Sequence, residues 1–171
     1  MLALQHGAAE ASDFYAIVAN GGRLVTPHLL LDVEQPSSNG TPGRVLPTPP
    51  PPAPEPTNVD GQALAVVREG LFEATHSSLG TSAAIFGGFP VPISGKTGTA
   101  EKVLDPGDGY PRIFNQSWWC GYGPSDSPQL VVCALIENGG HGGDAAAPAA
   151  LKVFEQFFGK QATQNGPIHS D

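Results

Sequence analysis

Residues 115–137, NQSWWCGYGPSDSPQLVVCALIE, decide the fold class of this chain. Two apolar runs, 115–123 and 129–137, are rich in the aromatic and β-branched residues that favour strands. They are separated by PSDSP, residues 124–128, whose prolines, serines and aspartate favour a tight turn. Because so short a connection joins only antiparallel neighbours, the stretch predicts a β-hairpin.

A third strand and three helices are predicted around this hairpin. Residues 91–100 form the further strand, and apolar residues three and four positions apart predict helices over 7–20, 59–75 and 144–158. Asp144 is the expected N-cap of the last helix. The expected buried faces are Ala11, Phe14, Tyr15 and Val18 in the first helix and Ala63, Val66, Val67, Gly70, Leu71 and Ala74 in the second. Helices packed on an antiparallel sheet make the fold class α+β.

The remaining segments are predicted to be connections. Residues 35–57 contain nine prolines and are expected to form a flexible surface insert without packed elements. The small, glycine-rich residues 76–89 predict a loop, and residues 159–171 predict a polar tail. Residues 1–10 lack the basic and apolar regions of a signal peptide. The length of 171 residues suits one domain.

Composition excludes two classes of partner. The formal net charge is −8 with only eight lysines and arginines, so no basic surface for nucleic acid is expected. The longest uninterrupted apolar run, residues 130–136, suits a buried strand and is far too short to cross a bilayer. The hydrophobic fraction of 40% is sufficient for a core.

No metal site and no organic cofactor are expected. His141 lies among glycines without a second ligand at metal spacing, and DPGDG at 105–109 lacks the ligand spacing of a calcium loop. Cys120 and Cys133 are too few for a disulfide framework or a zinc site. Their spacing is compatible with opposite positions on the hairpin, so a disulfide stays open, although the sequence favours two small buried thiols.

The stretch PISGKTGTAEK, residues 92–102, contains the candidate catalytic and substrate-binding residues. A phosphate-binding loop needs a glycine five positions before the glycine of its Gly-Lys-Thr and a helix after it. Here Pro90 occupies the position of that first glycine, and the residues after Thr99 do not form a helical pattern. The nucleotide-binding interpretation therefore fails, and the stretch is better placed on a strand that lines a cleft.

On such a strand, alternation places Lys96 and Gly98 on one face and Thr97 and Thr99 on the other. Lys96 supplies positive charge, and Gly98 lets a substrate backbone lie close because it has no Cβ. The Thr99 hydroxyl can bind a carboxylate, and its backbone N–H can stabilise a developing oxyanion. This set suits acyl transfer on an extended peptide bound as an added strand.

The chain resembles the class B, high-molecular-weight penicillin-binding proteins of the elongation type, whose third motif is K-T-G. The resemblance extends over most of residues 11–158, in the order of that family. It rests on GKTGTAEK at 95–102, FYAIVANGGRLVTPHLL at 14–30, LAVVREGLFEAT at 64–75, SWWCGYGP at 117–124, and LVVCALIENGG with AAAPAALKVFEQFF between 130 and 158. It implies a partial transpeptidase domain over 1–171.

Two catalytic motifs of that family are missing. No serine is followed three positions later by lysine, so the S-x-x-K motif of the nucleophile is absent. The one S-x-N, Ser37-Ser38-Asn39, lies in the proline-rich insert, where a hydroxyl cannot be preorganised. The chain is therefore expected to be inactive alone, as the C-terminal part of a longer enzyme.

The resemblance implies a peptidoglycan D,D-transpeptidase that acts by serine acyl transfer. It assigns a proton-relay role to Lys96 and substrate binding to Thr97, Gly98 and Thr99. It implies the peptidoglycan stem peptide, β-lactams and proteins of the cell-elongation machinery as partners. It also implies a place on the extracytoplasmic face of the plasma membrane, held by an N-terminal anchor that this chain lacks. The alternative is a non-catalytic binding or scaffold module derived from the same fold.

Overall fold

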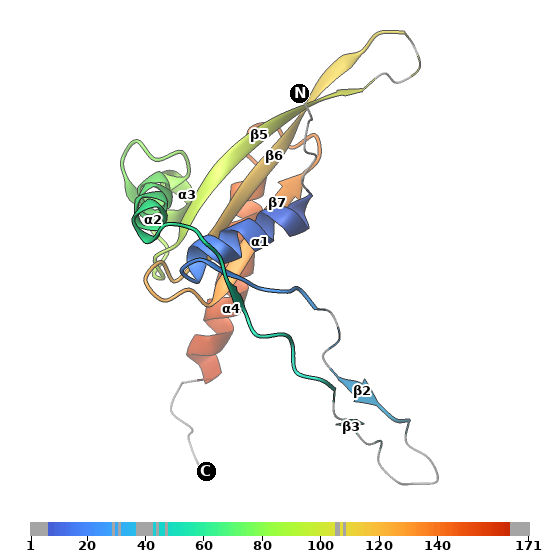
Figure 1. Cartoon of the computed structure of the whole chain (residues 1–171). Coiled ribbons are helices and arrows are strands. Elements are labelled where there is room, and N and C mark those ends of the chain that lie inside the picture. Colours follow the sequence, from blue (N-terminus) through green and yellow to red (C-terminus); the bar gives the residue numbers. More distant parts are fainter. Residues whose placement is uncertain are drawn as a thin grey trace, which may run out of the picture.

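The centre of the molecule is a three-stranded antiparallel sheet. The computed structural model describes residues 7–28, 30, 32–36, 43, 45–46, 48–104, 107 and 109–164, with the backbone alone for Leu104 and 160–164. The strands are β5 (Ser94–Leu104), β6 (Arg112–Gly123) and β7 (Leu130–Ile136), in the order β5-β6-β7 (Figure 1). Helices flank this sheet, so the α+β prediction is confirmed.

The predicted hairpin is confirmed as the β6–β7 pair. Cys120 lies opposite Cys133 in its register, and Trp119 lies opposite Ala134. The turn is closed by the Gln129 amide, which donates to the Gly123 carbonyl at 2.8 Å. The turn prediction succeeded because it rested on residues adjacent in the chain.

Each face of the sheet is covered by a different helix. Helix α1 (Ala8–Ala19) lies over one face and α4 (Ala146–Gln164) over the other (Figure 1). Alternation along β6 divides its side chains between these layers. Tyr122 packs toward α1 with Val18 and Leu64, while Trp119 packs toward α4.

The larger core lies between the sheet and α4. Trp119 is fully buried, stacks on Phe86 with ring centroids 4.5 Å apart, and meets Phe154 edge-on at 5.9 Å. Aromatic contacts of this kind add about 0.5–1.5 kcal/mol per pair beyond the burial of apolar area. The buried members of this cluster are Phe86, Ile93, Trp119, Val132, Ala146, Ala147, Ala150 and Phe154.

Several predicted loops and ends are corrected. The expected loop at 76–89 contains a one-turn helix, α3 (Ala83–Phe86), because Phe86 is drawn into the core. Strand β5 continues to Leu104, four positions beyond the predicted end, by pairing with the start of β6. Helix α4 begins at Ala146 and passes through Gly159 to Gln164, so the predicted tail is partly helical. Asp144 accepts from the His141 amide at 2.9 Å, within the preceding loop.

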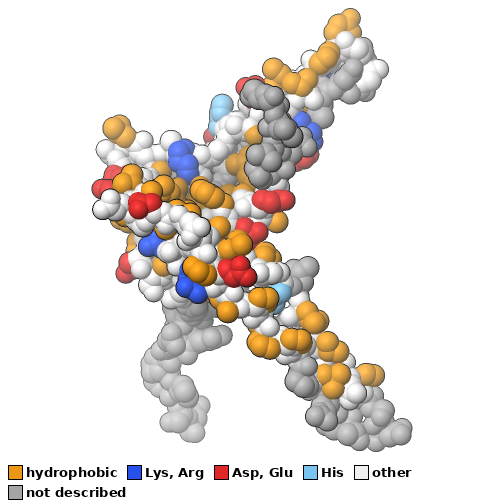
Figure 2. Space-filling model, in the orientation of Figure 1, with side chains coloured by type: hydrophobic (Ala, Val, Ile, Leu, Met, Phe, Trp, Pro, Cys, Tyr) orange, Lys and Arg blue, Asp and Glu red, His pale blue; other side chains and the backbone are white. Residues whose placement is uncertain are grey.

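Most of the apolar face predicted for helix α2 (Gly61–His76) is exposed in the structure. Asp60 caps it by accepting from the amides of Gln62 and Ala63, so its start obeys local rules. Only Leu64 and Thr75 are buried, whereas Val66 is 68% exposed. Phe14 of α1 is likewise 59% exposed. Of the predicted stripe, Leu71 packs against the cluster of Val18 and Tyr122, whereas Ala63, Val66, Val67 and Gly70 are exposed. Figure 2 shows exposed apolar side chains on the side of the molecule where α2 lies.

The proline-rich segment is not wholly irregular. Strand β1 (Arg23–Leu24) pairs with β4 (Glu55–Pro56), and β2 (Val33–Glu34) pairs with β3 (Val45–Leu46). At the base, the amide and hydroxyl of Thr57 both donate to the Gly22 carbonyl, at 2.8 and 2.6 Å. The Ser37-Ser38-Asn39 triplet lies outside the described residues.

Within the described parts of the chain, no helix combines the length and apolar character needed to cross a bilayer.

Candidate active site

The K-T-G-T residues lie on β5 at the edge of the central sheet. Strand β6 pairs with one side of β5, and no described strand pairs with the other. Lys96 and Thr99 are exposed, and Thr97 and Gly98 are half-buried. An edge strand presents unpaired backbone donors and acceptors, so a peptide can add to it as a further strand.

The register confirms the alternation expected along β5. Thr97 lies opposite the core residue Trp119, so both point toward the α4 side. Lys96 lies opposite Cys120 and starts toward the α1 side. Gly98 lies opposite Trp118, where an added Cβ would come within 3.3 Å of the Trp118 Cβ.

The long side chain of Lys96 nevertheless bends round the edge of β5 to contact Thr97 on the other face. Its Nζ lies 3.0 Å from Thr97 Oγ1, 3.0 Å from the Thr97 carbonyl oxygen, and 3.2 Å from Thr81 Oγ1. Among the described residues, no carboxylate lies within ion-pair distance of Lys96. The ammonium is thus held by neutral oxygens, and its charge is available to an anion from outside.

Thr81 is a member of this cluster that the sequence analysis missed. The Thr97 hydroxyl donates to Thr81 Oγ1 at 2.9 Å, in addition to the contact with Lys96. Thr81 was assigned to a loop because it precedes β5 by many residues and follows no periodic pattern. The neighbouring Gly80 is the sequence feature that could have pointed to Thr81. In the structure a Cβ there would meet the Glu73 carbonyl oxygen at 2.6 Å, so this glycine permits a tight return of the chain.

Thr99 lies beside the loop between β7 and α4. Its Oγ1 accepts from the Gly142 amide at 3.2 Å. Ser117, opposite Thr99 in the register and fully buried, donates to the His141 carbonyl at 2.8 Å and accepts from the Ala146 amide at 3.0 Å. One loop therefore connects the sheet, the start of α4 and the Thr99 hydroxyl.

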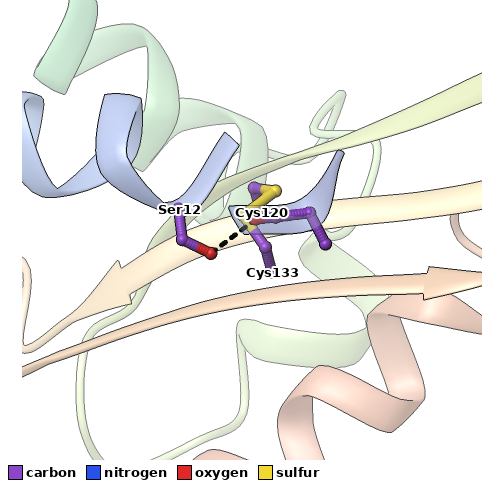
Figure 3. The surroundings of a disulfide bond; sticks show 4 residues. Ser12, Cys120 and Cys133 are labelled. Atoms are coloured by element: carbon purple, nitrogen blue, oxygen red, sulfur yellow. Dashed lines mark hydrogen bonds between the residues drawn. A yellow bond between two sulfur atoms is a disulfide. The ribbon is translucent and has the colours of Figure 1, made fainter. Parts of the chain in front are cut away.

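A disulfide lies one strand behind Lys96. Cys120 and Cys133 are bonded across β6 and β7, beneath α1, where Figure 3 also shows Ser12. Cys120 is 6% exposed, as expected from the sequence, but Cys133 is half-buried. The favoured interpretation as two thiols was wrong. The hairpin register brings the two side chains directly together, and the sequence could not fix that register.

Two phenols lie between α1 and the sheet: Tyr122 of β6 is fully buried, and Tyr15 of α1 is half-buried. Burial raises the pKa of Tyr122, with smaller lowering contributions from Ser94 and Arg68. Burial also raises the pKa of Tyr15, and neighbouring Tyr122 adds to that rise. The Ser94 hydroxyl is engaged with Ser125 at 2.8 Å, and the Tyr122 hydroxyl has no hydrogen-bond partner among the described residues.

The other polar residues singled out in the sequence have structural surroundings. Lys102, near the far end of β5, pairs with Glu137 at 3.4 Å, and both side chains are well exposed. His141 is an exposed loop residue. Of the DPGDG segment at 105–109, Asp105, Pro106 and Asp108 lie outside the described residues. Within the described part, no group of three His, Cys, Asp or Glu could hold a metal.

Comparison with known proteins identifies what this arrangement is similar to. A family profile described as the penicillin binding protein transpeptidase domain matches residues 4–155. The peptidoglycan D,D-transpeptidase MrdA of Haemophilus influenzae is 28% identical over 157 residues, which cover 86% of this chain and 23% of that protein. Penicillin-binding protein 2B of Streptococcus pneumoniae is 25% identical over 158 residues, covering 91% of this chain and 23% of that protein. The chain spans about a quarter of the length of these relatives.

Solved structures agree with these matches. Penicillin-binding protein 2 of Pseudomonas aeruginosa, in complex with WCK 5153, matches with a TM-score of 0.67 and 25% identity, covering 89% of this chain and 30% of that one. The D,D-transpeptidase domain of a peptidoglycan glycosyltransferase from Eggerthella lenta matches with a TM-score of 0.64 and 29% identity, covering 90% of this chain and 33% of that one. The resemblance inferred from the K-T-G stretch is confirmed.

Proposed function

Because the chain belongs to the penicillin-binding protein transpeptidase family, we propose that it supplies the K-T-G wall of a peptidoglycan D,D-transpeptidase. The observation that carries this proposal is the polar cluster on the free edge of β5. There the Lys96 ammonium, which has no carboxylate partner among the described residues, lies with three threonine hydroxyls, those of Thr81, Thr97 and Thr99. They lie beside the side of β5 with which no described strand pairs.

The cluster suits the substrate end of a two-step acyl transfer. A serine hydroxyl attacks the carbonyl of the D-alanyl-D-alanine bond, an ester forms, and the terminal D-alanine leaves as an amine. The amine of a second stem peptide then attacks the ester, which restores the serine and makes the cross-link. In this scheme Thr97 and Thr99 hold the terminal carboxylate, the Thr99 N–H stabilises the oxyanion, and Lys96 assists the proton relay.

The nucleophile of that reaction is not among these 171 residues. No S-x-x-K occurs in the chain, and the single S-x-N is in the proline-rich segment. We therefore propose that the chain contributes binding and electrostatic groups, while the nucleophilic serine and its lysine base come from sequence outside it. Alone, the chain is expected to form no covalent adduct with a β-lactam.

The disulfide supports an extracytoplasmic location. Disulfides form and persist in oxidising compartments such as the bacterial periplasm, and are rare in the cytosol. Cys120 and Cys133 are bonded here. The proposed setting is the outer face of the plasma membrane, with peptidoglycan stem peptides, β-lactams and elongation-machinery proteins as the partners.

The test joins the chain to the segment encoded upstream of its first codon and measures labelling by a fluorescent penicillin. If that segment carries S-x-x-K, the joined protein is expected to be labelled and the chain alone to remain unlabelled in intact-mass spectrometry. Lys96→Ala should abolish labelling. Lys102→Ala is the matched control, because Lys102 lies on the same strand, carries the same charge and pairs with Glu137 away from the cluster.

The missing nucleophile also favours a second candidate, a non-catalytic binding or scaffold module that keeps the fold. An upstream segment without S-x-x-K, or an adduct formed by the chain alone, would contradict the proposed division of roles. Equal labelling of Lys96→Ala and Lys102→Ala would remove Lys96 from the site.

A further inference from the structure

The loop between β7 and α4 is seated directly on the K-T-G-T strand. The Gly142 amide donates to Thr99 Oγ1 at 3.2 Å. On either side the loop is fixed to the body of the protein. The Ala147 amide donates to the Gly142 carbonyl at 3.2 Å, and buried Ser117 donates to the His141 carbonyl at 2.8 Å.

The approach of the loop to the strand requires glycine at position 142. Gly142 is buried, and a Cβ there would collide with the Gly98 carbonyl oxygen and lie 2.6 Å from the Trp118 carbonyl oxygen. Both obstacles are backbone atoms of the central sheet, so neither can move aside cheaply. Gly143 differs, because its nearest atom would be the Thr81 carbonyl oxygen at 3.7 Å, an ordinary contact distance.

The contact determines what the Thr99 hydroxyl can offer. A threonine hydroxyl has one donor hydrogen and two acceptor lone pairs. An amide N–H occupies one lone pair, so the hydroxyl hydrogen must point elsewhere. A hydroxyl that accepts a hydrogen bond also becomes a stronger donor, through mutual polarisation of the two bonds. Thr99 is exposed, so this donor faces solvent and any ligand on the edge of β5.

We infer that Gly142 is a positioning residue, whose backbone amide orients the Thr99 hydroxyl as a hydrogen-bond donor to the terminal carboxylate of an acyl-D-alanyl-D-alanine peptide. The inference rests on the proposed function, since that function supplies the carboxylate. The inference gives the loop between β7 and α4 a role in selecting peptides with a free C-terminal carboxylate over peptides with a neutral C-terminus. Loss of one such orienting bond is expected to weaken that selection roughly threefold to tenfold.

The experiment uses the 171-residue chain labelled with ¹⁵N. Diacetyl-L-lysyl-D-alanyl-D-alanine and its C-terminal amide are titrated separately, and chemical-shift changes give an affinity for each. The wild type should prefer the carboxylate form. Gly142→Ala should lose most of that preference, whereas Gly143→Ala, the matched control in the same loop, should keep it.

A second measurement does not depend on Gly142→Ala folding. Hydrogen exchange of the Gly142 amide should be slowed in the wild type, slowed in Thr99→Ser, which keeps the hydroxyl, and fast in Thr99→Val, which lacks it. Fast exchange in the wild type overturns the inference, as does an unchanged carboxylate preference in Gly142→Ala. If the wild type shows no preference for the carboxylate, the substrate side of the proposed function fails as well, so the two failures are distinguishable.

Discussion

Removal of the Cys120–Cys133 cross-link should destabilise the protein by an amount that follows from its position. The two cysteines are 13 residues apart in sequence. The cross-link limits the freedom of the unfolded chain, and closing a loop of this length is worth about 3 kcal/mol in the chain-entropy model. For a domain of 150–250 residues, each kcal/mol moves the melting temperature by about 2–4 °C. Reduction should therefore lower Tm by roughly 6–12 °C.

The assay is thermal and urea unfolding, followed by circular dichroism, of the oxidised protein, the reduced protein and the Cys120→Ala/Cys133→Ala double variant. The double variant loses the sulfur packing as well as the cross-link, so it should be no more stable than the reduced protein. The urea slope should rise on reduction, because the released unfolded chain exposes more surface.

The reduced wild type is the decisive sample, since it keeps the side chains and loses only the bond. A reduced protein that melts within about 1 °C of the oxidised form would refute the reasoning, because a loop of this length predicts a far larger change. A loss confined to the double variant would assign the stability to packing around Cys120, which is buried, and not to the cross-link.

Three further outcomes are expected from single substitutions. Phe154→Ala should cost about 3–5 kcal/mol in urea unfolding, because it empties the aromatic cluster around Trp119; a loss below about 1 kcal/mol would mean that α4 does not hold this core. Asp60→Ala should cost about 1 kcal/mol by removing the cap of α2, and Asp60→Asn, which retains an acceptor, should recover most of it. Tyr122→Phe should flatten the alkaline loss of stability. Burial raises the pKa of Tyr122 above its ordinary value of about 10, so the unfolded chain releases this proton first and stability, complete below that pH, falls as pH rises. Identical pH profiles of the two proteins between pH 9 and 12 would contradict this account.

The sequence predicted those parts of the fold that depend on neighbours in the chain. The hairpin at 115–137 was recognised because its turn residues separate two strand-like runs. Alternation along β5 predicted that Lys96 and Thr97 lie on opposite faces, as the pairing of β5 with β6 shows. K-T-G and the segments around it are sufficient to indicate the family.

Contacts between distant residues could not be predicted in this way. Thr81 joins the cluster from 15 positions before Lys96, with no periodic pattern to announce it. Phe86 is fully buried within a stretch whose glycines suggested only a loop. The stripe on α2 was misjudged for a different reason: periodicity reveals which side of a helix is apolar, but burial needs a second surface, and Val66 has none among the described residues.

The narrow base of the proline-rich segment has a consequence for how this chain tolerates change. Arg23 Nη2 donates a hydrogen bond to the Pro54 carbonyl, 31 residues away in sequence. The Thr57 hydroxyl donates to the Gly22 carbonyl, 35 residues away. These hydrogen bonds hold the two ends of the proline-rich segment together, independently of the residues between them. Loop-closure cost grows only slowly with length, by about 0.6 kcal/mol per doubling. Foreign sequence such as a tag, a reporter or a whole small domain can therefore be spliced between Leu24 and Glu55 while the sheet and its K-T-G edge keep their geometry.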